Sequence, residues 1–338
     1  MIDSNQEGTG GAESTRLRGL PFMDLYVRLD PKGRGEARYR SPARDYSNNW
    51  SRPLPDLYRA EVEAMATLLA EDGARADSAF SYDGMRFRRS VQKMGNGQLW
   101  VTLRRINARV PMLEEMSVSE QLMAQLRRFG QRDGLILISG PTGHGKTTMG
   151  FSLLSDYLHR LGGVGITVED PVEYDLDGPV GEYGYCYQVE VEDEDGWVEA
   201  LKRALRWTPR YLFVGEVRSP RAAEQILRAA TTGHLVITTI HAGSIEESIM
   251  GLLHLASQCV GDAAPYMLAQ GLTAAWHQTL TETGPYLRYV FTEENNNGDP
   301  VRALIRENKV GMINSYIDKQ IARVGAQRGV DPITGKRT

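Results

Sequence analysis

A glycine-rich stretch in the middle of the chain, "GPTGHGKT" at residues 140–147, has the residue types and spacing of a phosphate-binding (Walker A) loop. It follows the apolar run "LILIS" and opens a helical pattern, which is the setting such loops require. Glycines let backbone N–H groups close around phosphates, the lysine reaches the β and γ phosphates, and the next hydroxyl binds Mg²⁺. We therefore expect ATP and Mg²⁺ as ligands, although a glycine-rich turn without a ligand is the alternative. The expected contacts are Gly140, Thr142, Gly143, Gly145, Lys146, Thr147 and Thr148, with Thr147 also at Mg²⁺.

Acidic residues follow two further apolar runs. "YLFVGE" ends in Glu216, where P-loop enzymes place an acid near Mg²⁺ or the attacking water. "ITVEDPVEY" leaves a strand pattern for Glu169, Asp170 and Glu173, and a carboxylate held there could orient or deprotonate water. The alternatives are a solvated strand end and an acidic surface loop, and "VEVEDEDGW" at residues 189–197 is expected to be such a loop.

Two histidines flank another strand pattern in "TTGHLVITTIHAG". His234 and His241 are seven residues apart and would face opposite sides of an ideal strand, which argues against a metal pair. A single histidine is often structural, but beside a γ-phosphate it could sense that group.

The composition excludes several classes of protein. With 338 residues and 41% hydrophobic content the chain can form two domains with proper cores. Its net charge of −4 provides no overall basic field, so direct nucleic-acid binding is not expected. Cys186 and Cys259 are too few for a disulfide framework and too far apart for a zinc site. No run approaches the ~20 apolar residues that span a bilayer, so we expect a cytoplasmic protein with membrane contact only through partners.

Periodicity predicts two domains. Residues 1–16 are polar and glycine-rich and are expected to form a disordered tail. Residues 17–110 alternate in strand fashion around one helical stretch, with "NG" at 96–97 as a hairpin turn, which predicts a small α+β domain. Residues 111–118 are expected to be a linker. The remainder, 119–338, alternates short apolar strands with helices and predicts a parallel-rich sheet covered by helices.

Two local details follow from the same patterns. Ser117 is expected to cap the helix that begins after the linker, with Glu120 completing a capping box and Gly130 ending the helix. The last 90 residues are expected to be mainly helical, interrupted by a strand pair around "EENNNGD".

These motifs, in this order and at these intervals, resemble the secretion superfamily of ATPases, which includes type IV pilus motors, type II secretion ATPases and their type IV secretion relatives. That family has a Walker A loop, an acidic box T-x-E-D-P-x-E, a Walker B segment ending G-E-x-R-D and a histidine box T-G-H-L-V-x-x-T-x-H. The resemblance covers about residues 80–318. The matching stretches are "GPTGHGKTT", "TVEDPVEY", "LFVGEVRS" and "TTGHLVITTIH".

The resemblance implies a fold and a set of site residues. The fold would be α/β, with a RecA-like P-loop domain whose last part is helical, preceded by a PAS-like domain. The roles are a lysine at the phosphates, a Walker B acid at Mg²⁺ directly or through water, an acidic-box glutamate that activates water, and two histidines near the γ-phosphate. In this chain they fall on Lys146, Glu216, Glu173 and the pair His241 and His234.

Family members are hexamers in which the N-terminal domain supplies arginines to a neighbour's nucleotide. "MRFRRS" and "TLRRIN" fall where those arginines occur, so Arg88 and Arg104 are the candidates, with a solvated strand face as the alternative. His144 stands where pilus motors have serine and resembles the "GHGK" loop of Dot/Icm-type and conjugative ATPases.

The resulting hypothesis is an ATP-hydrolysing hexameric motor of a type IV secretion, conjugation or type IV pilus system. It would act on inner-membrane secretion or pilus platform proteins. The alternatives are a nucleic-acid-translocating RecA-like motor and a nucleotide-gated docking switch with little turnover.

Overall fold

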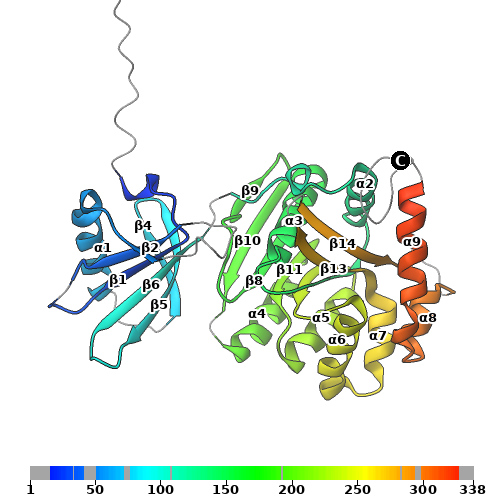
Figure 1. Ribbon diagram of the computed structural model, residues 1–338. Helices are drawn as coiled ribbons and strands as arrows, with labels where there is room; N and C mark the ends of the chain where they lie inside the picture. Colours follow the sequence, from blue (N-terminus) through cyan, green and yellow to red (C-terminus); the bar gives the residue numbers. More distant parts are fainter. Residues whose placement is uncertain are drawn as a thin grey trace, which may run out of the picture. The chain divides into compact units, whose positions relative to one another are not determined.

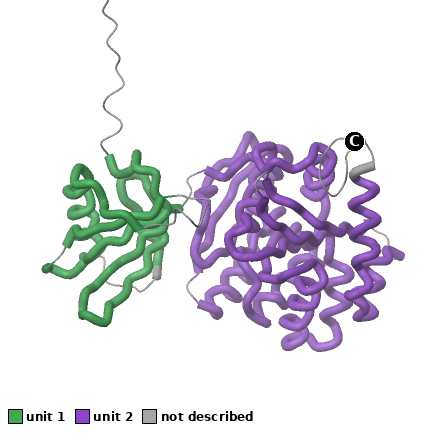
Figure 2. Tube along the Cα trace, in the orientation of Figure 1, with its two compact units in different colours: residues 1–108 green, residues 109–338 purple. Residues whose placement is uncertain are grey.

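The computed structural model describes residues 16–32, 34–41, 51–71, 77–106, 109–191, 193–281, 284–293 and 298–326, so the predicted tail lies almost wholly outside the described residues. The chain divides into two compact units, residues 1–108 and 109–338 (Figure 2). In the described part of the chain, no helix has the length and apolar character needed to cross a membrane.

Unit 1 contains an antiparallel six-stranded sheet in the order β3-β2-β1-β6-β5-β4. Helix α1 (Arg59–Glu71), preceded by the 3₁₀ turn Asp56–Tyr58, packs its buried residues Val62, Met65 and Leu69 against this sheet. Side chains alternate along the strands, so one face is apolar and the other polar. The strands are β1 (Asp24–Arg28), β2 (Ala37–Arg40), β3 (Ser51–Pro53), β4 (Asp77–Tyr82), β5 (Met85–Lys93) and β6 (Leu99–Arg105).

Unit 2 is built on an eight-stranded sheet in the order β14-β13-β7-β12-β11-β8-β10-β9. The strands from β13 to β10 are parallel to their neighbours, and β14 and β9 are antiparallel edge strands. The carboxyl ends of the parallel strands therefore lie together along one border of the sheet. We call this border the carboxyl edge, as distinct from the edge strands β14 and β9. The strands are β7 (Gly134–Ser139), β8 (Gly163–Glu169), β9 (Gly178–Val180), β10 (Gly184–Glu190), β11 (Tyr211–Glu216), β12 (Leu235–Ile240), β13 (Leu272–Thr281) and β14 (Gly284–Phe291).

Helices cover both faces of this sheet (Figure 1). Helix α3 lies on one face beside α2, whereas α4 to α7 form a layer on the other face and α9 packs against β14. The bounds are α2 (Glu120–Phe129), α3 (Lys146–Leu161), α4 (Glu194–Arg206), α5 (Pro220–Ala230), α6 (Ile245–Val260), α7 (Ala263–Gly271), α8 (Pro300–Arg306) and α9 (Asn314–Ala326).

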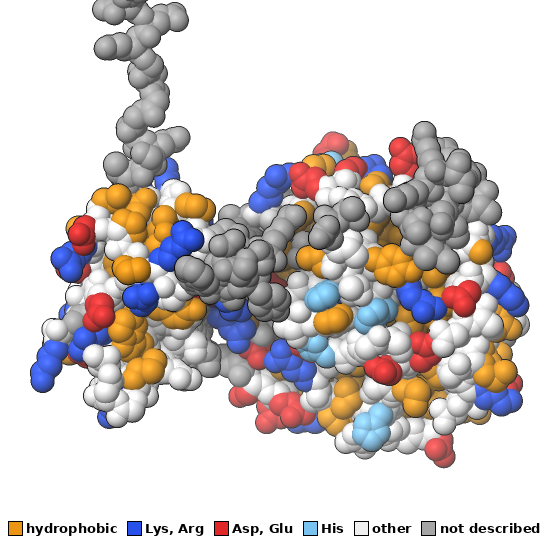
Figure 3. Space-filling view, in the orientation of Figure 1, with side chains coloured by type: hydrophobic (Ala, Val, Ile, Leu, Met, Phe, Trp, Pro, Cys, Tyr) orange, Lys and Arg blue, Asp and Glu red, His pale blue; other side chains and the backbone are white. Residues whose placement is uncertain are grey.

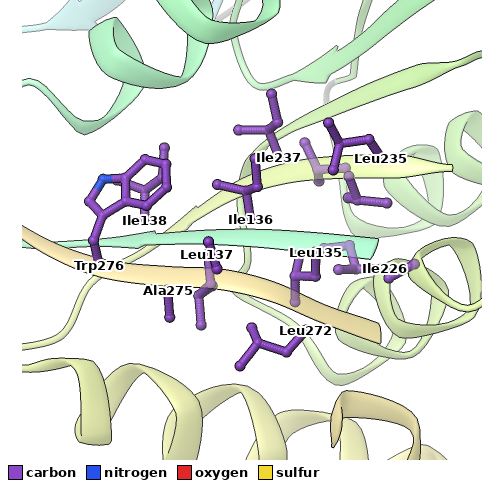
Figure 4. Close-up of a cluster of buried hydrophobic side chains, with 14 of the residues drawn as sticks. Leu135, Ile136, Leu137, Ile138, Ile226, Leu235, Ile237, Leu272, Ala275 and Trp276 are labelled. Carbon is purple, nitrogen blue, oxygen red and sulfur yellow. The ribbon is translucent and has the colours of Figure 1, made fainter. Parts of the chain in front are cut away.

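The central strands are buried on both faces, which explains their continuous apolar sequences. Figure 4 shows this for β7: Ile136 and Ile138 point to one side and Leu135 and Leu137 to the other. All four are fully buried, as is Trp276 of the neighbouring β13. The site residues project from the ends of these strands, and the packed core fixes the positions of those ends.

The predicted RecA-like P-loop fold is consistent with this helix-covered, mostly parallel sheet. The predicted hairpin at Asn96 and Gly97 joins β5 to β6, with Gly97 at φ 82° and the Gln98 N–H donating to Asn96 Oδ1 at 3.1 Å.

The stretch at residues 189–197, expected to be an acidic loop, lies partly in β10 and partly in α4. Three further local expectations differ from the structure. The helix cap is Ser119, whose hydroxyl accepts from Leu122 N, and not Ser117, which has φ 54°. Residues 111–118, expected as a linker, lie within unit 2, because Leu113 and Met116 of the 3₁₀ turn Leu113–Met116 are buried in its core.

The C-terminal strand pair is the third difference. It comprises β13 and β14, and so it precedes "EENNNGD" rather than surrounding it; residues 294–297 of that stretch lie outside the described residues.

Candidate nucleotide-binding site

The phosphate-loop sequence connects the end of β7 to the start of α3. Gly145 caps α3 with φ 76°, so the first helical turn begins at Lys146 and its N–H groups face the loop. Gly140 has φ 149°, and a Cβ there would lie 2.2 Å from the Gln278 carbonyl oxygen. These two glycines let the loop turn tightly and approach β13 closely.

Lys146 is the buried cation of this loop. Its side chain is enclosed, and Nζ donates to the carbonyl oxygens of Gly140 and Pro141 at 2.9 and 3.0 Å. Burial lowers the pKa of Lys146, and the nearby carboxylates of Glu216 and Glu173 oppose that shift. The lysine is therefore held inside the curve of the loop. An anion bound there would stabilise the charged form of its side chain.

The two threonines after the lysine contact the acidic box. Thr147 Oγ1 donates to Glu173 Oε1 at 3.4 Å, and Thr148 Oγ1 lies 2.8 Å from the Tyr174 hydroxyl. Glu173 itself is exposed, whereas Tyr174 is buried against α3. The exposed carboxylate is thus placed beside the residue expected at Mg²⁺.

Glu216 stands at the carboxyl end of β11, and a bulge between Val214 and Glu216 interrupts the register with β12. Such bulges redirect side chains. Glu216 Oε2 accepts from Arg218 at 2.7 and 2.9 Å, and Oε1 lies 3.1 Å from His241 Nε2. The other ring nitrogen of His241 lies 3.5 Å from Thr142 Oγ1. His241 therefore bridges the loop at Thr142 and Glu216 at the end of β11.

His234 and His241 were expected to lie together beside the phosphates. Within a single chain this expectation is wrong for His234. His234 precedes β12 and His241 follows it, so the six-residue strand separates them by roughly 20 Å. The His234 Nδ1 lies 2.7 Å from the Pro209 carbonyl oxygen at the opposite edge of the sheet. At this position the His234 side chain links the start of β12 to the segment that precedes β11.

His144 connects the loop to β13. Its Nδ1 accepts from Leu280 N at 3.0 Å, and its carbonyl accepts from Gln278 Nε2 at 2.7 Å. Gln278 is buried, and its Oε1 has no hydrogen-bond partner among the described residues. In Figure 3, histidine side chains gather on the face of unit 2 that is turned to the viewer.

Sequence reasoning assigned no site role to Arg218, Tyr174 or Gln278, although all three contact the predicted residues. Arg218 is the arginine of the Walker B pattern, and Gln278 lies in "LTAAWHQTL". Nothing in the local pattern marks Tyr174, because its partner Thr148 is 26 residues away.

The candidate arginines lie in unit 1. Arg88 and Arg104 are directly opposite each other on β5 and β6 and are both exposed on the face away from α1. Arg104 Nε also donates to Oδ1 of the buried Asp24 at 2.8 Å. The pair forms a cationic position on this sheet face.

The residues around the loop fit a nucleotide with Mg²⁺. A helix N-terminus, a buried lysine and tight glycine turns suit phosphate groups. Hydroxyl and carboxylate oxygens, here Thr147 with Glu173 and Glu216 nearby, are the donors that Mg²⁺ prefers.

Residues 72–329 match the model of the family described as "Type II/IV secretion system protein". The chain belongs to this family. Among members, a twitching motility protein of Neisseria gonorrhoeae is 31% identical over 278 residues, which cover 78% of this chain and 72% of that protein. The type IV pilus retraction ATPase PilT of Pseudomonas aeruginosa is 32% identical over 283 residues, 78% of each chain. The sequence-based prediction of a secretion-family ATPase is thereby confirmed.

Solved structures of secretion ATPases have the same fold. The pilus retraction motor PilT with bound ADP superimposes with a TM-score of 0.66 at 27% identity, covering 91% of this chain and 90% of PilT. The Legionella pneumophila ATPase DotB reaches 0.66 at 20% identity, covering 90% and 85%, and shows likeness of fold alone. The coverage means that the likeness of fold extends over both units of this secretion ATPase.

Proposed function

We propose that this secretion-family ATPase is the motor of a type IV secretion, conjugation or type IV pilus system. The observation that carries the proposal is the meeting of Lys146, Thr147, Glu173, Glu216 and His241 at one sheet edge, joined by the contacts above. These residues come from four separate segments, so their meeting is a property of the fold rather than of one motif.

The charged groups of the site have hydrogen-bond partners within the chain. Lys146 is bonded to loop carbonyls, and Glu216 is bonded to Arg218 and His241. Phosphate oxygens carry full negative charge and form stronger hydrogen bonds with an ammonium than neutral carbonyls do. Binding of ATP would therefore draw Lys146 from the carbonyls to the phosphates.

Hydrolysis would then be in-line attack by water on the γ-phosphate. Glu173 is exposed and next to Thr147, so its carboxylate can accept a proton from the attacking water and hold it in line. Lys146 and the α3 N-terminus stabilise the charge that spreads over the transferred group. Thr147 and Glu216 would hold Mg²⁺, which would supply further neutralisation of that charge. His241, bonded to Glu216, is placed to respond to the presence of the γ-phosphate.

The assembled form we propose is a homohexamer in which unit 1, predicted to be PAS-like, supplies arginines to a neighbour's nucleotide. Arg88 and Arg104 support this role because they are exposed side by side on one sheet face. Guanidinium groups are well suited to phosphate oxygens. Rotation of the two units during the cycle would transmit force to platform proteins at the inner membrane.

A subunit-mixing experiment tests the shared site. Lys146→Ala and Arg88→Ala chains should each be inactive as homo-oligomers. Random co-assembly of equal amounts would restore complete sites wherever an Arg88→Ala subunit receives Arg88 from a Lys146→Ala neighbour, about a quarter of all sites in a closed ring. Phosphate release well above that of either variant alone is expected. Activity that stays absent after mixing, while one variant co-purifies in hexamers with an affinity-tagged copy of the other, contradicts a trans arginine at this position.

A further inference from the structure

Glu169 is a buried carboxylate that the mechanism above does not use. It is the last residue of β8, its side chain is 2% exposed, and burial raises its pKa to about 7. Burying a carboxylate costs free energy unless hydrogen bonds compensate, so a buried carboxylate usually has a structural or functional role. The hydrogen-bond partners of Glu169 indicate that role.

Three donors converge on this carboxylate. Oε1 accepts from the Thr167 hydroxyl at 2.7 Å and from Gln188 Nε2 at 3.1 Å, and Oε2 accepts from the backbone N–H of Glu173 at 3.2 Å. Thr167 belongs to the same strand, and Gln188 belongs to the neighbouring β10. The acceptor of the Glu173 N–H is therefore fixed to two strands of the core.

Gln188 holds the other end of the same loop. Besides Glu169, its Nε2 donates to the Tyr174 carbonyl at 2.9 Å, and its Oε1 accepts from Leu176 N at 2.8 Å. The Tyr174 hydroxyl in turn meets Thr148 at the start of α3. The loop after β8 is thus fastened at residues 173, 174 and 176, and its Tyr174 hydroxyl contacts the start of α3.

We propose that Glu169 and Gln188 form a clamp that positions Glu173 for catalysis. Neither side chain touches nucleotide; the clamp acts through the backbone of the loop and so determines where the Glu173 carboxylate stands relative to Thr147. The inference rests on the proposed role of Glu173 in orienting water. A displacement of about 1 Å in such a group can reduce turnover by about 100-fold while leaving substrate contacts in place.

The substitution Glu169→Gln distinguishes loss of the clamp from a general loss of stability. A glutamine can place its carbonyl oxygen at the Oε1 position, where it keeps Thr167 and Gln188 as donors. Its amide NH₂ then occupies the Oε2 position and faces the Glu173 N–H, donor against donor. The substitution introduces no charge and keeps the side-chain volume, so we expect the fold to be retained while the tie to Glu173 is lost.

The experiment measures three quantities on the full chain: kcat for phosphate release, the Kd of a non-hydrolysable ATP analogue, and hydrogen–deuterium exchange of the peptide covering residues 170–177. For Glu169→Gln we expect kcat to fall about 10- to 100-fold, Kd to stay within about twofold, and exchange to rise in that peptide. Gln188→Ala should give the same pattern. Glu182→Gln, which removes an exposed carboxylate from the turn before β10, is the matched control and should leave all three unchanged.

Glu173→Gln distinguishes failure of the clamp from failure of the proposed function. If Glu173→Gln is inactive while Glu169→Gln and Gln188→Ala both turn over like the unmodified chain, the clamp is refuted and the role of Glu173 stands. If Glu173→Gln itself keeps full kcat, the proposed role of Glu173 falls and the clamp falls with it. A fall in kcat accompanied by an equal loss of analogue binding would also refute positioning of Glu173.

Discussion

The buried carboxyl group of Glu169 predicts a specific dependence of stability on pH. Its pKa is raised from 4.5 to about 7, mainly by burial and secondarily by the charge of Glu173, against the opposing hydrogen bonds from Thr167, Glu173 N–H and Gln188. The folded chain therefore holds this proton more tightly than the unfolded chain does. Its contribution to stability is fully present below pH 4.5 and is lost as the pH rises through 7.

The size of the effect follows from the shift. Each pKa unit corresponds to about 1.36 kcal/mol, so the full shift represents about 3 kcal/mol. Between pH 5 and pH 8 the linkage relation gives a loss of about 2–3 kcal/mol in the free energy of unfolding from this group alone. In Glu169→Gln no proton titrates at this position, so the loss should be absent.

Urea denaturation of the full chain, followed by tryptophan fluorescence to which the buried Trp276 contributes, measures this difference. The free energy of unfolding of the unmodified chain, relative to that of Glu169→Gln, should fall by about 2–3 kcal/mol from pH 5 to pH 8. Glu182→Gln should follow the unmodified chain at both pH values. Parallel pH dependences for the unmodified chain and Glu169→Gln would refute the reasoning.

Three further outcomes are expected. Ser119→Ala should lower the free energy of unfolding by about 1 kcal/mol through loss of the α2 cap. Ser117→Gly should not lower it, because Ser117 has φ 54°, which glycine adopts readily. Equal losses for the two variants in urea denaturation would contradict the assignment of the cap. Gly140→Ala should weaken ADP binding at least about tenfold, since its Cβ would lie 2.2 Å from the Gln278 oxygen, and unchanged affinity in a fluorescent-nucleotide titration would count against the loop geometry. Trp276→Ala should cost about 3–5 kcal/mol, because the indole is fully buried in the core, and a loss below about 1 kcal/mol would mean that this core is misplaced.

The local features of unit 2 could be predicted from the sequence because each depends on neighbouring residues. The apolar runs of β7, β11 and β12 are the mark of strands buried on both faces, and the strand–loop–helix order of the phosphate loop is contained within 20 residues. The placement of Glu216 and His241 near that loop follows from the parallel arrangement, since Glu216 ends β11 and His241 directly follows β12.

Features that depend on pairing between distant segments could not be predicted. The expected role of His234 came from the family resemblance; the parallel order that places His241 beside the phosphate loop places His234, before β12, at the far end. The strand β10 lay partly in a stretch expected to be an acidic loop, because its pairing with β8 and not its composition makes it a strand. The contact between Glu169 and Gln188 joins residues 19 positions apart and has no signature in either.

The central claim is that this chain hydrolyses ATP at the edge of the sheet where Lys146 and Glu216 meet. The most direct test is the steady-state rate of phosphate release from Mg·ATP by the unmodified chain and by Glu216→Gln, with Glu182→Gln as the control. The account predicts turnover by the unmodified chain and the control, and a fall of at least about 100-fold in Glu216→Gln with nucleotide binding retained. Equal rates for Glu216→Gln and the unmodified chain would contradict it.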